Sequence, residues 1–264
     1  MKTHLVKTLA VFAALATAAP TVMLAQNAIA APFNADNLTD FGAPDSTAGG
    51  GTRGCFAPSN TETNAGKSLT LLTPHNLKLA NNEEVMPLTV QSHPEFFWYV
   101  PEETKAQSVE FILSDEKDNP IYQAELAVPA TAGIMSVSLP QEEEYALKEG
   151  MRYHWVVSLV CDRGSALASA GNIFVDGYIQ RLDANSELAQ QVAQSPDADD
   201  YAKAGIWQEA LASFAHQRRD RPQDVAIAQD WQEFLESVNL GQFADVEFVS
   251  SHPLNPMTSE SLPQ

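Results

Sequence analysis

The chain has 264 residues, of which 34 are acidic and 15 basic, so its formal net charge at pH 7 is −19. A surface this acidic repels phosphate backbones and anionic lipid headgroups, which argues against nucleic acid and acidic membranes as partners. Hydrophobic residues make up 44% of the sequence, enough for a buried core, so disorder along the whole chain is not expected.

The first thirty residues have the pattern of an export signal. Lys2 and Lys7 give a positive start, an apolar centre follows, and residues 28–30 have the small-x-small form that signal peptidase accepts. We predict a signal peptide over residues 1–30, with cleavage after Ala30. An uncleaved anchor helix is the less favoured alternative, because Pro20 interrupts the apolar run needed to cross a bilayer of about 30 Å. We expect no transmembrane segment after cleavage.

The sequence contains two cysteines, Cys55 and Cys161. In an exported chain an even number favours a disulfide, and only one pairing exists here. Alternation along residues 153–161 turns Cys161 toward the core. A bridge would hold the glycine-rich segment before Cys55 on the sheet, and closing a loop of about 100 residues contributes about 4 kcal/mol. Two buried free thiols are the less favoured alternative.

Residues 31–66 are poor in large apolar side chains and predict an irregular N-terminal arm. From 67 to 183, short segments rich in aromatic and β-branched residues alternate with turn residues, which predicts an antiparallel β-sandwich. Residues 96–100 are apolar on both faces, so this strand should be covered on both sides. Gly177, inside the last strand, predicts a bulge or a close approach of backbone.

Two motifs resemble fibronectin type III and other immunoglobulin-like domains. The first is an early Pro-x-Phe-x-Trp-like strand, and the second is a Leu-x-x-Gly-x-x-Tyr-x-Trp turn and strand that begins at Leu147. The resemblance implies that Tyr153 closes a corner of the sandwich. It carries no function.

After Arg181 the apolar period becomes helical, and residues 184–245 predict a small C-terminal helical region. Residues 201–214, with Pro222 beyond them, resemble the later part of a tetratricopeptide repeat, and a third helix is expected from about Asp224. The fold class predicted is therefore mixed α and β, an immunoglobulin-like sandwich followed by a tetratricopeptide-like hairpin.

A single hairpin cannot bury its own apolar face. Phe97 and Tyr99, on the outward face of their strand, are the expected cover, so we predict one compact body. Residues 246–264 contain several prolines and predict a disordered tail.

No metalloprotease, dinucleotide-binding, phosphate-binding or nucleophile-elbow motif is present, so we predict no catalytic, cofactor-binding or metal-binding residue and expect no cofactor. Residues 115–119 could offer oxygens to Ca²⁺, but a solvated hairpin turn explains them better. Glu142–Glu144 could hold a cation or serve as an acid/base pair, but an exposed acidic run is the better explanation. His93 and His154 lack companions at metal-ligand spacing.

Arg218, Arg219 and Arg221 form the only basic cluster of the acidic mature chain. Cations at the C-terminal end of a helix are stabilised by the helix dipole, and this explanation is sufficient. The alternative is that they dock an acidic partner, which makes them the candidate partner-binding residues.

Several motifs occur together in a specific order along the chain. They are Gly51–Cys55, Pro94–Pro101, Leu147–Asp162, Phe174–Gln180 and Tyr201–Leu211. With them, the chain from about Gly51 to Leu240 resembles the cyanobacterial family called domain of unknown function 928. The resemblance implies an exported cyanobacterial protein and brings no catalytic residue.

The favoured hypothesis is a non-enzymatic envelope protein, periplasmic or extracellular, that binds a protein partner or acts as a scaffold. One alternative is a hydrolase of envelope polymers, which requires carboxylates that converge about 5 to 10 Å apart. The other is a carbohydrate-binding module, which requires exposed aromatic platforms. The residues that test them are Asp115, Asp118, Asp162 and Asp176 for the first, and Trp98, Trp155, Trp207 and Trp231 for the second.

Overall fold

The computed structural model describes residues 30–35, 55, 68–74, 86–102, 104–161, 172–194 and 197–255. The predicted signal peptide, except Ala30, and most of the predicted arm lie outside these residues.

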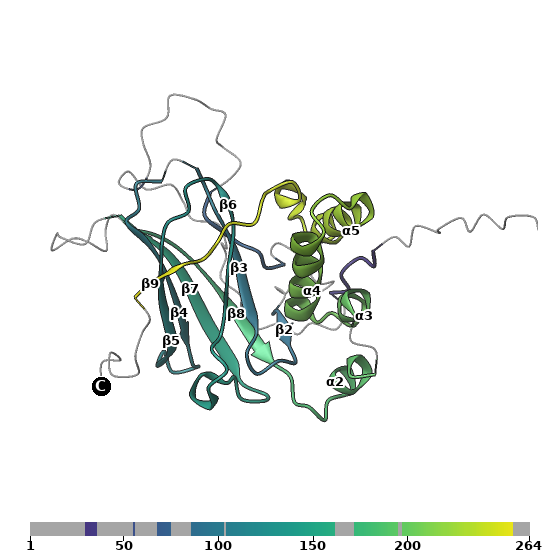
Figure 1. Ribbon diagram of the computed structural model, residues 1–264. Helices are drawn as coiled ribbons and strands as arrows, with labels where there is room; N and C mark the ends of the chain where they lie inside the picture. The colour runs from purple at the N-terminus through teal and green to yellow at the C-terminus, as the bar shows by residue number, and fades with distance from the viewer. Residues whose placement is uncertain are drawn as a thin grey trace, which may run out of the picture.

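The described strands form two sheets (Figure 1). The smaller has the order β1-β3-β6 and is antiparallel; it contains β1 (Thr70–Leu71), β3 (Glu95–Val100) and β6 (Gly133–Ser138). The larger has the order β2-β8-β7-β4-β5-β9, and only its β2–β8 pair is parallel. Its strands are β2 (Leu88–Thr89), β8 (Ile173–Arg181), β7 (Arg152–Val160), β4 (Ser108–Ser114), β5 (Pro120–Leu126) and β9 (Pro253–Asn255).

Four α-helices lie between β8 and β9 in the described part of the chain: α2 (Glu187–Val192), α3 (Ala198–Ala204), α4 (Trp207–Asp220) and α5 (Val225–Glu236). Short 3₁₀ turns lie at Glu143–Tyr145 and Gly241–Phe243. Asp197 and Asp224 cap α3 and α5 with their carboxylates, and Gly205, at φ 75°, ends α3 in the left-handed conformation that glycine adopts without strain. The mixed α and β class predicted from sequence is confirmed.

Strand β3 explains how the layers assemble. Phe96 and Trp98 belong to the core between the two sheets, while Phe97 and Tyr99 belong to the core between the smaller sheet and the helices. Side chains alternate across a strand, so one strand serves both cores. The larger sheet, the smaller sheet and the helices therefore form three layers (Figure 1), and the predicted cover by Phe97 and Tyr99 is confirmed.

The core between the sheets is aromatic and tightly packed. Phe96 lies 5.0 Å from Trp155 between ring centroids, and Trp98 stacks on Phe111 at 6.0 Å. Gly177 faces this core: a Cβ there would lie 3.0 Å from Leu71 and 3.3 Å from the indole of Trp155. Of the two predictions for Gly177, the close approach of backbone is the one observed.

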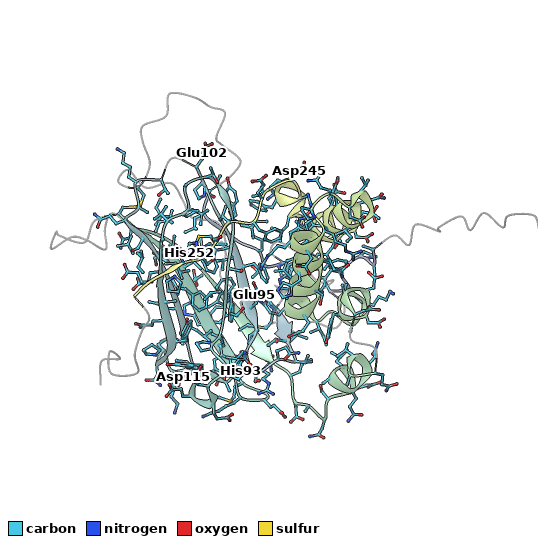
Figure 2. The ribbon with its side chains drawn as sticks, in the orientation of Figure 1. His93, Glu95, Glu102, Asp115, Asp245 and His252 are labelled. Carbon is cyan, nitrogen blue, oxygen red and sulfur yellow. A yellow bond between two sulfur atoms is a disulfide. The ribbon has the colours of Figure 1, made fainter. Side chains whose placement is uncertain are left out.

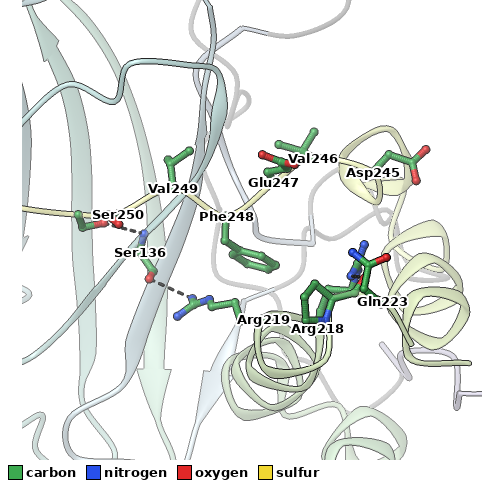
Figure 3. Close-up of a pocket in the computed structure, with 12 residues that line it drawn as sticks. Ser136, Arg218, Arg219, Gln223, Asp245, Val246, Glu247, Phe248, Val249 and Ser250 are labelled. Carbon is green, nitrogen blue, oxygen red and sulfur yellow. Dashed lines mark hydrogen bonds between the residues drawn. The ribbon is translucent and has the colours of Figure 1, made fainter. Parts of the chain in front are cut away.

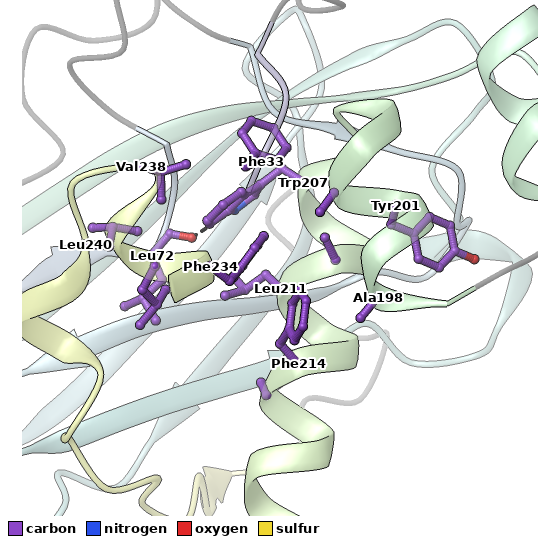
Figure 4. Close-up of a cluster of buried hydrophobic side chains, with 14 of the residues drawn as sticks. Phe33, Leu72, Ala198, Tyr201, Trp207, Leu211, Phe214, Phe234, Val238 and Leu240 are labelled. Carbon is purple, nitrogen blue, oxygen red and sulfur yellow. Dashed lines mark hydrogen bonds between the residues drawn. The ribbon is translucent and has the colours of Figure 1, made fainter. Parts of the chain in front are cut away.

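The second core centres on Trp207 (Figure 4). Its ring stacks on Phe234 with centroids 4.9 Å apart, meets the edge of Phe33 at 5.1 Å, and donates its indole N–H to the carbonyl of Leu72 at 3.0 Å. Residues 30–35 form no helix or strand, yet Phe33 is buried here. The start of the arm is therefore part of the helical core.

Residues 245–255, which we call the strap, correct the prediction of a disordered tail over 246–264. The carbonyl of Glu247 accepts from Ile134 of β6 at 2.8 Å, Val249 donates to the Ile134 carbonyl at 2.9 Å, and β9 pairs with β5. Exposed edge strands attract pairing partners, and an edge position tolerates a proline such as Pro253. The strap thus covers the edges of β6 and β5; residues 256–264 lie outside the described residues.

The predicted disulfide joins Cys55 to Cys161, whose Cα atoms are 5.4 Å apart. Cys55 is completely buried and its carbonyl accepts from the Lys105 amide at 2.7 Å. Cys161 directly follows β7, and near the start of that strand the Tyr153 hydroxyl accepts from the Lys148 amide at 2.6 Å. Both ends of β7 are therefore fastened to preceding parts of the chain.

Candidate functional site

A groove of about 620 Å³ lies between the end of α4 and the strap (Figure 3). Its walls are residues 218–219 and 222–223, strap residues 245–251, and Ser136 of β6. It therefore stands where the helices, the smaller sheet and the C-terminal strap meet.

Arg219, which lines the groove, belongs to an ion pair. The Arg219 guanidinium donates to Glu95 Oε1 at 3.0 Å and to Ser136 Oγ at 3.1 Å, and His216 Nε2 lies 2.7 Å from Glu95 Oε2. Burial alone would raise the pKa of Glu95, but the hydrogen bond from Ser136 and the charge of Arg219 hold it below its usual value. Figure 2 shows Glu95 in the region between the sheets and the helices. Glu95 is thus ionised at neutral pH and binds α4 to β3.

Arg219 also lies between two aromatic rings. Its guanidinium carbon is 5.3 Å from the centroid of Phe97 and 4.7 Å from that of Phe248. Cations are attracted to the faces of such rings. Arg219 therefore fastens the strap to the smaller sheet.

The three predicted partner-binding arginines differ in position. Arg219 is used inside the molecule, as described. Arg221 lies 3.7 Å from Asp224 and is exposed, and Arg218 donates to the carbonyl of Pro222 at the groove. Arg218 and Arg221 remain candidates for contact with a partner.

We expect Arg219→Met to lower the free energy of unfolding by about 2 kcal/mol. Methionine fills the space between the rings but leaves the Glu95 carboxylate without the guanidinium that it pairs with. The loss of stability is reduced because the Arg219 side chain is 31% exposed to solvent. The measurement is urea unfolding at pH 7, with Glu95→Gln and the double variant completing a cycle. Additive losses in the double variant would contradict the coupling.

The strap, whose residues 245–251 line the groove, has an unpaired backbone edge. Glu247 and Val249 bond to β6, and successive residues of an extended strand direct their backbone groups to opposite sides. Within the described residues, the backbone N–H and C=O of Phe248 and Ser250 have no hydrogen-bond partner. These groups can accept an additional strand. Sequence reasoning missed this edge because it predicted a disordered tail.

The other predicted clusters have ordinary structural roles. Asp115 accepts from the amides of Lys117 and Asn119 at 2.8 and 2.9 Å within an exposed hairpin turn, and the bond from the Asn119 side chain lowers the pKa of Asp115. His154 lies 2.9 Å from Asp176 on β8. No group of three or more His, Cys, Asp or Glu side chains that could hold a metal ion occurs among the described residues.

The described residues that were named as tests of the two alternative functions give them no support. Asp115 and Asp118 lie in the exposed turn, and Asp176 pairs with His154. Asp162 lies outside the described residues. All four tryptophans are buried and offer no platform to a sugar.

Glu209, in the first turn of α4, is a buried carboxylate that sequence reasoning also missed. It accepts from the Thr89 hydroxyl at 2.5 Å and from the amides of Val90 and Gln91 at 3.3 Å each. Burial raises the pKa of Glu209 to about 7 although these bonds oppose the shift. Its place among the apolar residues 206–211 is the one signal in the sequence that marks it as inward-facing.

Fold and site together define a class of protein: a two-sheet β body whose smaller sheet is covered by helices and whose C-terminal strap borders an open groove. The chain belongs to the family described as Domain of Unknown Function (DUF928), whose model matches residues 48–248. No curated protein and no solved structure matches it. None of the helices in the described residues has the length and apolar character needed to cross a membrane.

Proposed function

We propose that this is an exported, non-enzymatic envelope protein of cyanobacterial origin that binds an extended segment of another envelope protein in the groove. The disulfide supports export, because such bonds persist in oxidising compartments. The export signal predicted over residues 1–30 supports it independently.

We also propose that the sandwich is of the fibronectin type III kind. Sheet β1-β3-β6 facing strands β8-β7-β4-β5 supports this, as does the hydrogen bond from the Lys148 amide to the Tyr153 hydroxyl at the corner. The short turn at Gly205 between α3 and α4 supports a tetratricopeptide-like hairpin.

The observation that carries the binding proposal is the unpaired edge at Phe248 and Ser250 beside a groove of about 620 Å³. An extended peptide can add to such an edge through main-chain hydrogen bonds, while side-chain pockets give selectivity. Arg218 offers a cation to an acidic side chain of the peptide, and Asp245 and Glu247 offer anions. The preferred segment therefore carries charges of both signs.

The test is selection from a displayed peptide library on the full mature chain, followed by binding to two variants. Ser250→Pro removes the outward N–H at an exposed position, and we expect affinity to fall about tenfold, as for one hydrogen bond worth about 1.4 kcal/mol. Ser250→Ala keeps that N–H and should bind as the parent does. Thermal melting checks that both variants fold.

Arg218→Gln should weaken acidic peptides in particular. Equal binding by the parent chain and Ser250→Pro would overturn the proposal, and so would selected peptides that bind away from the groove.

A further inference from the structure

Residues 30–35 are seated between α3 and α5, where Figure 1 draws them as the short purple segment. The Ala31 amide donates to Asp199 Oδ1 at 3.0 Å, the Phe33 amide to Ser237 Oγ at 3.1 Å, and the Asn34 amide to the Ala202 carbonyl at 2.9 Å. Ala30 and Ala31 are only 5% and 6% exposed. The predicted cleavage point therefore lies where the chain is buried against the helices and hydrogen-bonded to them.

The carboxylates around Ala30 and Ala31 repel one another. Asp230 of α5 accepts from the Ala30 amide; its pKa is raised by burial and then by the charges of Asp199, Glu233 and Asp224. Glu233 Oε2 is buried and has no hydrogen-bond partner in the described residues. We call Asp199, Asp230 and Glu233 the acidic niche.

We propose that the acidic niche is the binding site for the new amino terminus that signal cleavage creates at Ala31. The inference rests on the export part of the proposed function. In the cleavage, water adds across the Ala30–Ala31 peptide bond: the hydroxyl joins the carbonyl carbon of Ala30, and the nitrogen of Ala31 takes the hydrogen. A further proton from solvent makes that nitrogen an ammonium.

The ammonium fits the niche better than the amide does. An amide offers one N–H and no charge, while an ammonium offers three donors and a positive charge. One donor keeps the existing 3.0 Å contact with Asp199. The other two replace the N–H that Asp230 loses when Ala30 leaves, and the charge relieves the repulsion between the carboxylates.

The burial of the scissile bond determines the order of signal cleavage and docking. Signal peptidase cannot reach a bond whose two alanines are almost completely covered. Cleavage must therefore precede the docking of residues 31–34 against the helices, and the docked ammonium is a feature of the processed chain.

The experiment compares the chain that begins at Ala31 with the same chain acetylated at that residue. We expect acetylation to lower the melting temperature by about 3 °C, because it removes the charge but keeps an N–H. Asp199→Asn should reduce this difference, because it removes the carboxylate that the Ala31 nitrogen contacts at 3.0 Å. Asp200→Asn, which makes the same charge change on the next residue of α3, should preserve it.

Equal melting of the free and acetylated chains would overturn the inference, and so would a difference that Asp199→Asn leaves unchanged. N-terminal sequencing of the exported protein separates this failure from failure of the export proposal. A chain that does not begin at Ala31 refutes the processing step, while one that begins there and melts independently of acetylation refutes the niche alone.

Discussion

Replacing both cysteines by alanine should lower the free energy of unfolding by about 4 kcal/mol. Cys55 and Cys161 are 106 residues apart, and a crosslink over a loop of that length removes much of the conformational entropy of the unfolded chain. Alanine suits the site because Cys55 is completely buried, where a serine hydroxyl would need a new partner. The measurement is denaturant unfolding of the oxidised parent and of the double variant.

Reduction provides the matched control. Dithiothreitol should destabilise the parent by a similar amount and leave the double variant unchanged. Two free thiols on the denatured, unreduced exported protein would show that the bond does not form in the cell.

The sequence predicted well the features that local pattern determines. Alternation along residues 153–161 placed Cys161 on the face of Trp155, and the two apolar faces of β3 predicted cover on both sides. Asp224 marks a helix start because an acceptor side chain before an apolar period satisfies unpaired amides at the helix end. These signals arise within a few residues and need no knowledge of distant contacts.

The features that escaped prediction depend on distant partners. Pro253 suggests disorder when only the sequence is considered. The topology shows instead that the strand containing Pro253 pairs with the free edge of β5. Arg219 at the end of α4 looks like any cation favoured by the helix dipole, and only the structure brings Glu95, 124 residues away, to meet it. The groove is made of such contacts, so local pattern could not reveal it.

The burial of Glu209 could not be predicted from the sequence either. An acidic side chain in the first turn of a helix is favourable whether it is exposed or buried. The burial of Glu209 beneath β2 makes stability depend on pH. The folded-state pKa of about 7 lies above the ordinary value of 4.5, so folding favours the protonated form. The stability that this group contributes is fully present below pH 4.5 and is lost as pH rises through about 7.

We therefore expect the effect of Glu209→Gln on the free energy of unfolding to change sign as pH rises from about 4.5 through about 7. The three contacts of Glu209 all donate to its oxygens, so the glutamine amide lacks an acceptor and the variant should be about 1 kcal/mol less stable near pH 4.5. The parent loses about 3 kcal/mol from this group by pH 8, which the variant does not, so the variant becomes the more stable protein there.

Urea unfolding at half-unit pH steps measures both curves. Glu187→Gln, at the exposed first-turn glutamate of α2, is the matched control and should run parallel to the parent. If the Glu209→Gln curve also runs parallel, Glu209 ionises in the folded protein as freely as in the unfolded chain, and its burial beneath β2 carries no electrostatic cost.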